Sequence, residues 1–204
     1  MPDDKLGDPA KAALSLRRIA IARPKHLLVG DGTPIFHEAL PVLWACLEAR
    51  RDVYVNKINV DEAHWQDHTG DKAPYGCFVS DLDFEIGAEK LGFRVVRLPA
   101  GNTFCPVHWH TAEEELFIVL SGEPSLVTPR GNWRLRAGDY VAFPTRFSGA
   151  HKLINESDAD CEVIMVANND RRDVCSYPDS QKVLVEARDL MVRDNPELDY
   201  YDGE

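Results

Sequence analysis

The feature that most constrains the fold of this chain is a series of short apolar segments after residue 92, separated by turn-forming residues. Strand-like segments at such close spacing are typical of an antiparallel sandwich or barrel, because no helix of a βαβ unit fits between them. We therefore predict an all-β barrel over residues 85–170. The expected strands are Phe93–Leu98, Val107–His110, Glu115–Leu120, Ser125–Thr128, Trp133–Arg136, Tyr140–Phe143, His151–Ile154 and Cys161–Ala167.

Three further segments flank the predicted barrel. Residues 1–35 mix charged residues with glycine and proline, so we expect a flexible or loosely docked arm. Residues 36–84 are expected to pack on the barrel, with a short helix within Phe36–Arg50, a strand over Asp52–Val60 and then a polar loop. Residues 171–204 are expected to drape over the barrel as an extension that includes a strand at Lys182–Val185.

Charge and hydropathy argue against nucleic acid and membranes as partners. The chain carries 34 acidic and 23 basic residues, and its formal net charge of -11 repels polyanions. No apolar run approaches the roughly 20 residues that cross a bilayer, and the first twenty residues lack the apolar stretch of a signal peptide. The five cysteines form no CxxC pair, so we expect reduced thiols used mainly for packing. These features predict a cytoplasmic protein.

Three histidines and one glutamate form a candidate metal site. His108 and His110 are two residues apart on a predicted strand, so both imidazoles point to one face, with backbones about 6.6 Å apart. Glu115 opens the next predicted strand, where a hairpin return would place its carboxylate opposite the two imidazoles. His151, at the start of a later strand, is the candidate fourth ligand. Imidazole and carboxylate ligands suit one divalent transition metal such as Zn, Mn, Fe or Ni.

The spacing of these residues resembles the two signature motifs of the cupin superfamily. Two departures from the usual motifs are present. Six residues instead of five separate Gly101 from His108, and Arg146 replaces the usual glycine after Pro144, with His151 two residues later than is common. The matching residues are Gly101, His108, His110, Glu115 and Gly122 in the first motif, and Gly138, Pro144, His151 and Asn155 in the second.

The chain also resembles a group of bacterial cupins described as sugar-phosphate-isomerase-like. This resemblance is carried by Glu89–Gly92, Tyr177–Ser180 and Asp199–Glu204. It implies a double-stranded β-helix, or jelly-roll barrel, with one divalent metal at its mouth. The leading hypothesis, argued from the metal chemistry, is an enzyme whose metal acts as a Lewis acid on a small oxygen-rich, sugar- or acid-like molecule, in isomerase, lyase or dioxygenase chemistry. The alternatives are a non-enzymatic module that binds or senses a small ligand, and a structural barrel without metal.

Several residues near the motifs have more than one interpretation. Arg146 is a candidate substrate-binding residue, because its planar guanidinium suits a carboxylate or phosphate, and a surface arginine is the alternative. Glu114 would replace Glu115 as the ligand if it pointed inward. His64 and His68 are candidates for a loop that covers the metal, or are ordinary exposed histidines. We also predict a homodimer, because barrels of this kind often pair through their sheets.

Overall fold

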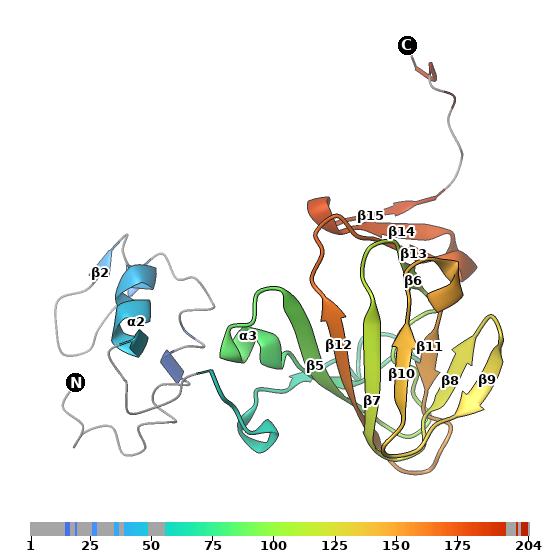
Figure 1. Cartoon of the computed structure of the whole chain (residues 1–204), viewed down its shortest axis with the longest axis horizontal. Coiled ribbons are helices and arrows are strands. Elements are labelled where there is room, and N and C mark those ends of the chain that lie inside the picture. Colours follow the sequence, from blue (N-terminus) through green and yellow to red (C-terminus); the bar gives the residue numbers. More distant parts are fainter. Residues whose placement is uncertain are drawn as a thin grey trace. The chain divides into compact units, whose positions relative to one another are not determined.

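Antiparallel strands dominate the part of the chain that the computed structural model describes (Figure 1). The described residues are 15–16, 19, 26–27, 35–36, 39–48, 56–194, 199 and 201–203. Contacts divide the chain into two units, which are considered separately. The first unit comprises residues 1–64 and 81–88, and the second comprises residues 65–80 and 89–204.

The first unit contains the predicted helix but not the predicted strand. Helix α2 spans Ala39–Glu48, and β1 (His26–Leu27) pairs with β2 (Ile35–Phe36). Residues 52–55 of the strand predicted over residues 52–60 lie outside the described chain. From Asn56 onward the prediction is wrong, because a turn and irregular backbone lead into the 3₁₀ helix η2 (Val60–Glu62). Asn59 explains the difference, because its side chain accepts a hydrogen bond from the Asp61 N–H and caps η2. Helix α3, Leu82–Ile86, completes this unit.

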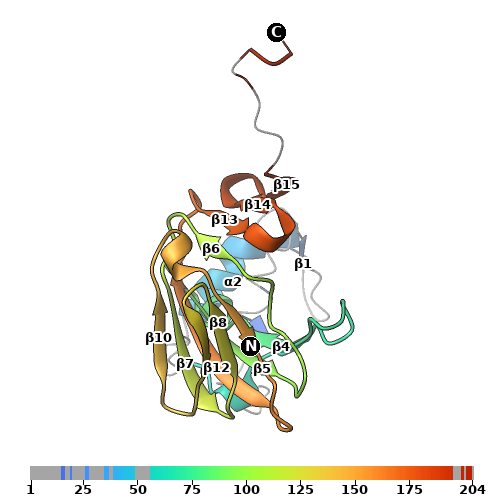
Figure 2. The same ribbon diagram turned by 90° about the vertical axis from the view of Figure 1, so that its right-hand side faces the viewer.

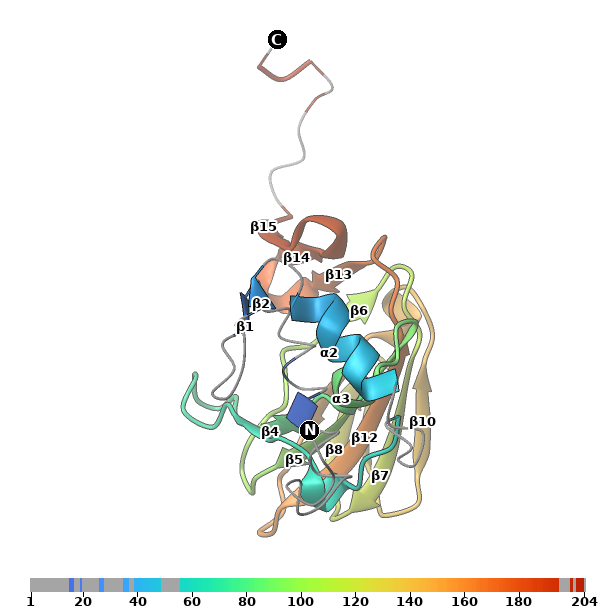
Figure 3. The ribbon, with the colours of Figure 1, turned by 90° about the vertical axis from the view of Figure 1, so that its left-hand side faces the viewer.

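The second unit is built from three antiparallel sheets, and the predicted all-β architecture is confirmed. The largest sheet has the order β10-β7-β12-β5-β4-β3, the second β11-β8-β9 and the third β15-β14-β13-β6. Figures 2 and 3 show β6, β13 and β14 together at one end of the other strands, and β13 pairs with both β6 and β14. The strand bounds are β3 Gln66–Asp67, β4 Phe78–Ser80, β5 Leu91–Leu98, β6 Trp109–His110, β7 Glu115–Ser121, β8 Ser125–Thr128, β9 Gly131–Arg134, β10 Tyr140–Phe143, β11 Lys152–Ile154, β12 Cys161–Asn168, β13 Val174–Tyr177, β14 Lys182–Val185 and β15 Leu190–Arg193. The 3₁₀ helices are η3 Phe147–Gly149, η4 Pro178–Ser180 and η5 Glu186–Arg188.

The core of this unit lies between the first two sheets and fixes which side chains point inward. Strand β7 contributes Phe117 and Val119, and both are almost fully buried. Because side chains alternate across a strand, Glu115 shares the inward face of these two residues. Glu114, one residue earlier, is exposed and its N–H donates to the Asn168 side chain. Glu115, and not Glu114, is therefore the inward carboxylate at this end of the core.

Most predicted strands agree with the structure, but the predicted hairpin does not. Strands β8, β10 and β14 have the predicted bounds, whereas β9 begins two residues earlier than expected. The hairpin between His108–His110 and Glu115 is wrong, since β6 pairs with β13 and β7 pairs with β10 and β12. The histidine pair and Glu115 therefore meet across sheets, and not along one ladder.

Candidate metal centre

The three predicted histidine ligands converge on one carboxylate oxygen of the fourth predicted ligand, Glu115. Glu115 Oε2 lies 3.4 Å from His151 Nε2, 3.5 Å from His110 Nε2 and 3.8 Å from His108 Nε2. The side chains come from three places in the fold. His108 and His151 face each other across an isolated β-bridge, His110 is on β6, and Glu115 begins β7. All four side chains are mostly withdrawn from solvent, with exposed fractions between 0% and 16%.

The opposite ring nitrogen of each histidine is held by a fixed acceptor. Nδ1 of His108 lies 3.0 Å from the Pro106 carbonyl oxygen, and Nδ1 of His151 lies 2.9 Å from the Gly149 carbonyl oxygen. Because a carbonyl oxygen only accepts hydrogen bonds, both Nδ1 atoms must carry the proton and donate it. In the neutral rings Nε2 then carries a lone pair, and it is this atom that points to Glu115.

Asp173 holds the His110 ring so that its Nε2 atom also points towards Glu115. Its Nδ1 lies 2.7 Å from Asp173 Oδ2, and Asp173 is fully buried. The other carboxylate oxygen accepts hydrogen bonds from the Ala112 N–H at 2.7 Å and from the Thr111 hydroxyl at 3.2 Å. A carboxylate that orients a metal-binding imidazole is a recurrent arrangement in metal sites. Sequence reasoning missed Asp173, because nothing in the surrounding Arg-Arg-Asp-Val sequence indicates burial or a partner 63 residues away.

Two aromatic rings fix the imidazole of His151. The Phe143 ring is stacked on it, with centroids 3.6 Å apart, and the Phe117 ring contacts it edge-on at 5.1 Å. The loop before His151 is also tightly built. A Cβ on Gly149 would lie 1.9 Å from the Pro144 carbonyl oxygen, so glycine is required there. His151 is therefore a rigid group, with its Nε2 aimed at Glu115.

The pKa shifts match this arrangement for two of the histidines. Burial lowers the pKa of His108 to about 4 and that of His151 to about 3, so both rings are neutral near pH 7. Burial also acts to lower the pKa of His110, but its contacts with Cys175, Glu115 and Asp173 outweigh burial and raise that pKa to about 10. A cation bound between these residues must therefore displace a proton from His110.

The centre meets the requirements of a small cation. Glu115 Oε2 and His151 Nε2 are buried atoms for which the described residues provide no hydrogen-bond partner. An ionised carboxylate oxygen and an imidazole lone pair repel each other at 3.4 Å unless a proton or cation lies between them. Ligand atoms about 2.0–2.1 Å from one ion lie roughly 3–3.4 Å apart. The three separations from Glu115 Oε2 are 3.4, 3.5 and 3.8 Å, and the ligand atoms of His108, Glu115 and His151 lie within 4.8 Å of one another. The donor set thus fits a divalent transition metal.

A cavity of about 300 Å³ opens beside the centre. Arg94 from β5, Glu113 and Tyr177 from β13 line it together with His108, His110 and Glu115. His108 stacks on the Tyr177 ring, with centroids 5.9 Å apart. A cavity of this size, lined by both charged and apolar side chains, accepts a small molecule.

The other candidate residues are not among the described residues that line this cavity. The Arg146 N–H donates to the His110 carbonyl oxygen at 2.6 Å. The Arg146 φ of 74° and ψ of 179° fall in a region that glycine favours, which matches the glycine expected there. His68 pairs with Asp71 at 3.1 Å in an exposed loop, and the His64 N–H donates to Glu85 within the first unit. A substrate-binding role for Arg146 stays a prediction.

Comparison with known proteins identifies the class. Residues 94–167 match the family model of the cupin domain, and no curated protein matches the sequence. The second unit therefore contains a cupin domain, and the predicted jelly-roll fold is confirmed. Among the described residues, no helix has the length and hydropathy needed to span a membrane.

Two solved structures share this fold over most of the chain. One is a candidate sugar phosphate isomerase from Acidithiobacillus ferrooxidans, with a TM-score of 0.62 and 21% identity over 71% of this chain and 97% of that chain. The other is a sugar phosphate isomerase of the cupin superfamily from Silicibacter pomeroyi, with a TM-score of 0.61 and 22% identity over the same shares. At these identities the likeness shows the fold alone.

Proposed function

We propose that this chain is a metal-dependent cupin enzyme that acts on a small oxygen-rich molecule. In this proposal His108, His110, Glu115 and His151 hold one divalent transition metal. The observation that carries the proposal is the convergence of three imidazole Nε2 atoms on one buried carboxylate oxygen, at 3.4, 3.5 and 3.8 Å. The hydrogen-bond acceptors at Nδ1 of the three histidines support the proposal, because they fix each ring in the orientation and tautomer that a metal needs.

The cavity beside the centre favours a polar substrate with an anionic group. Arg94 provides positive charge at its wall, and Phe104 and Pro106 provide apolar surface that limits access of water. A sugar-like or acid-like molecule fits this mixture of charged and apolar walls. The names of the two structural neighbours agree with a sugar phosphate as one member of this class.

The chemistry requires a Lewis acid and a group that exchanges protons. When bound, a divalent metal in such a site polarises a carbonyl or hydroxyl oxygen. Glu113 lines the cavity, and its Oε1 accepts a hydrogen bond from the Asp170 N–H at 2.8 Å, which holds its side chain in place. We assign Glu113 the transfer of a proton to or from the bound molecule, in isomerase or lyase chemistry. Dioxygenation is the competing reaction class, and it would require iron and oxygen.

Metal binding is tested first, by titrating zinc or manganese into the chelator-stripped protein in competition with a metal-sensitive dye. We expect one ion per chain, and weaker binding in His110→Ala and His151→Ala, since each loses one ligand. His68→Ala is the matched control, because His68 is an exposed histidine paired with Asp71. A wild-type protein that binds neither metal, or ligand variants that bind as tightly as the control, would refute the centre.

Catalysis is tested with the metal-loaded protein and a panel of sugar phosphates, hydroxy acids and keto acids followed by NMR. We expect conversion of at least one compound, lost with a chelator and in Glu113→Gln. A compound that binds tightly and is recovered unchanged after long incubation would favour the non-enzymatic binding module instead. The predicted homodimer is tested by sedimentation, where a monomer at micromolar concentration would exclude it.

A further inference from the structure

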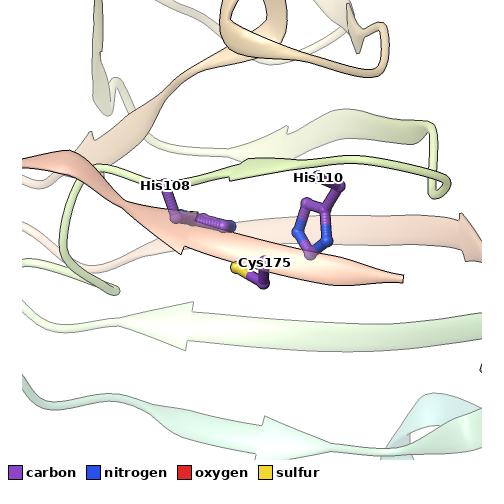
Figure 4. A group of neighbouring side chains, drawn as sticks. All are labelled: His108, His110 and Cys175. Atoms are coloured by element: carbon purple, nitrogen blue, oxygen red, sulfur yellow. The ribbon is translucent and has the colours of Figure 1, made fainter. Parts of the chain in front are cut away.

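A buried thiol lies next to the proposed metal ligands. Cys175 is on β13, in direct register with His110 on β6, and neighbours in such an antiparallel pair project to the same face. One ligand atom from each of His108, His110 and Cys175 lies within 4.8 Å of the other two. Figure 4 shows the two imidazoles and the thiol gathered between the segments that carry them.

The surroundings of Cys175 are those of a ligand more than of a packing residue. Its exposed fraction is 2%, yet it lines the cavity together with His108 and His110, whereas Cys161 belongs to the apolar core. His110 is the partner of Cys175 in the β13–β6 ladder, and Tyr177, two residues further along β13, lines the same cavity. The thiol therefore lies beside polar side chains of the cavity lining.

A second cysteine near the site faces a different atom. Cys105 Sγ lies 3.5 Å from His108 Nδ1, the ring nitrogen that donates to the Pro106 carbonyl oxygen. Cys105 is therefore on the side of the ring away from Nε2, which is the atom that points to Glu115. The two thiols are distinguishable by position, and Cys175 alone of the pair belongs to a described group of candidate ligands.

We propose that Cys175 supplies a thiolate ligand to the same metal ion, beside His108 and His110. This inference rests on the proposed metal centre. Bonds of about 2.3 Å to sulfur and about 2.0 Å to nitrogen would place the two ligand atoms roughly 3.5 Å apart, so atoms that lie within 4.8 Å of one another need to approach by no more than about 1.3 Å. On binding, the sulfur–metal bond forms, the S–H bond breaks and the proton leaves to solvent.

A thiolate changes which metal the centre prefers. Three imidazoles and a carboxylate alone accept manganese, zinc or iron, whereas a thiolate favours zinc, cobalt and iron over the harder manganese. A fifth protein ligand also leaves a six-coordinate ion one position for an oxygen atom of the bound molecule. The centre would therefore bind its substrate through one oxygen, with Arg94 and the cavity walls holding the remainder.

The test is the absorption spectrum of the protein loaded with cobalt(II). Thiolate ligation of cobalt gives a charge-transfer band in the near ultraviolet that imidazole and carboxylate ligands do not give. We expect the band in the wild-type protein and in Cys105→Ser, and its loss in both Cys175→Ser and Cys175→Ala. Cys46→Ser, which removes an exposed thiol on α2, is the background control. In Cys175→Ser the affinity for zinc should fall on the order of tenfold, with the affinity for manganese nearly unchanged.

The outcomes separate this inference from the proposed centre. Wild-type protein that binds cobalt without the charge-transfer band refutes Cys175 as a ligand and leaves the four-residue centre standing. A band that disappears in Cys105→Ser and persists in Cys175→Ser also refutes it. Wild-type protein that binds no metal refutes both. If the Cys175 variants do not fold, the wild-type and Cys105→Ser spectra decide the question: absence of the band from the wild-type protein, or its loss in Cys105→Ser, refutes the inference, and its retention in Cys105→Ser supports it.

Discussion

Replacing Asp173 with asparagine tests the orientation of the metal-binding imidazoles with the smallest possible change of shape. The Asp173 carboxylate accepts from His110 Nδ1 through one oxygen and from the Ala112 N–H through the other. Asparagine can keep the bond from Ala112, but it then turns an NH₂ group towards His110 Nδ1. To remain paired, His110 must accept at Nδ1 and carry its proton on Nε2, where the metal should bind.

The expected cost follows from these contacts. Loss of an orienting partner typically weakens metal binding about 10- to 100-fold, or about 1.4–2.7 kcal/mol. The metal-free variant should also lose about 1–1.5 kcal/mol of stability, because a charge-assisted bond worth about 1.5–3 kcal/mol becomes a neutral one worth about 0.5–1.5 kcal/mol. Dye competition with zinc and urea denaturation measure the two effects. Asp139→Asn, which alters a turn carboxylate that accepts from the Arg136 N–H, is the control. Folded Asp173→Asn with wild-type zinc affinity would show that Asp173 does not orient His110.

Three further predictions concern the residues around the centre. Arg146→Gly should stabilise the protein by about 1 kcal/mol or more in urea denaturation, because glycine adopts φ 74° and ψ 179° without strain; a loss of stability would contradict this. Phe143→Ala should lower the free energy of unfolding by about 3–5 kcal/mol, since it removes the ring stacked on His151. Tyr140→Ala, at an exposed side chain on the same strand, should change it by about 0.5 kcal/mol or less. The metal-free protein should lose stability as the pH falls from about 6.5 towards 4. Histidines in the unfolded chain take up protons in this range, whereas His108 and His151 in the folded protein, with pKa values of about 4 and 3, resist protonation. A urea midpoint that is constant across this range would refute the buried, neutral state of both rings.

Local patterns in the sequence were sufficient for most of the strands, but not for the choice between Glu114 and Glu115. All five residues from Leu116 to Leu120 are apolar, so it is the burial of Phe117 and Val119 in the structure that shows which face of β7, and hence which carboxylate, points inward. The turns before Ser125 and Tyr140 defined where β8 and β10 begin, because turn chemistry depends on neighbouring residues. Weak patterns were less reliable. At Asn56–Val60 a side-chain cap on η2 prevailed over a run that resembled a strand.

The sequence by itself determined the all-β class and the ligand types with their spacing, since both depend on periodicity and residue chemistry within short segments. Only the tertiary structure decided how the ligands meet. His108 and His110 approach Glu115 across two sheets, and Asp173 and Cys175 reach the site through the pairing of β13 with β6. The contacts of Asp173 with His110 and Thr111 join residues more than 60 positions apart. Strand order and sheet packing determine these contacts, and both depend on how the whole core packs together.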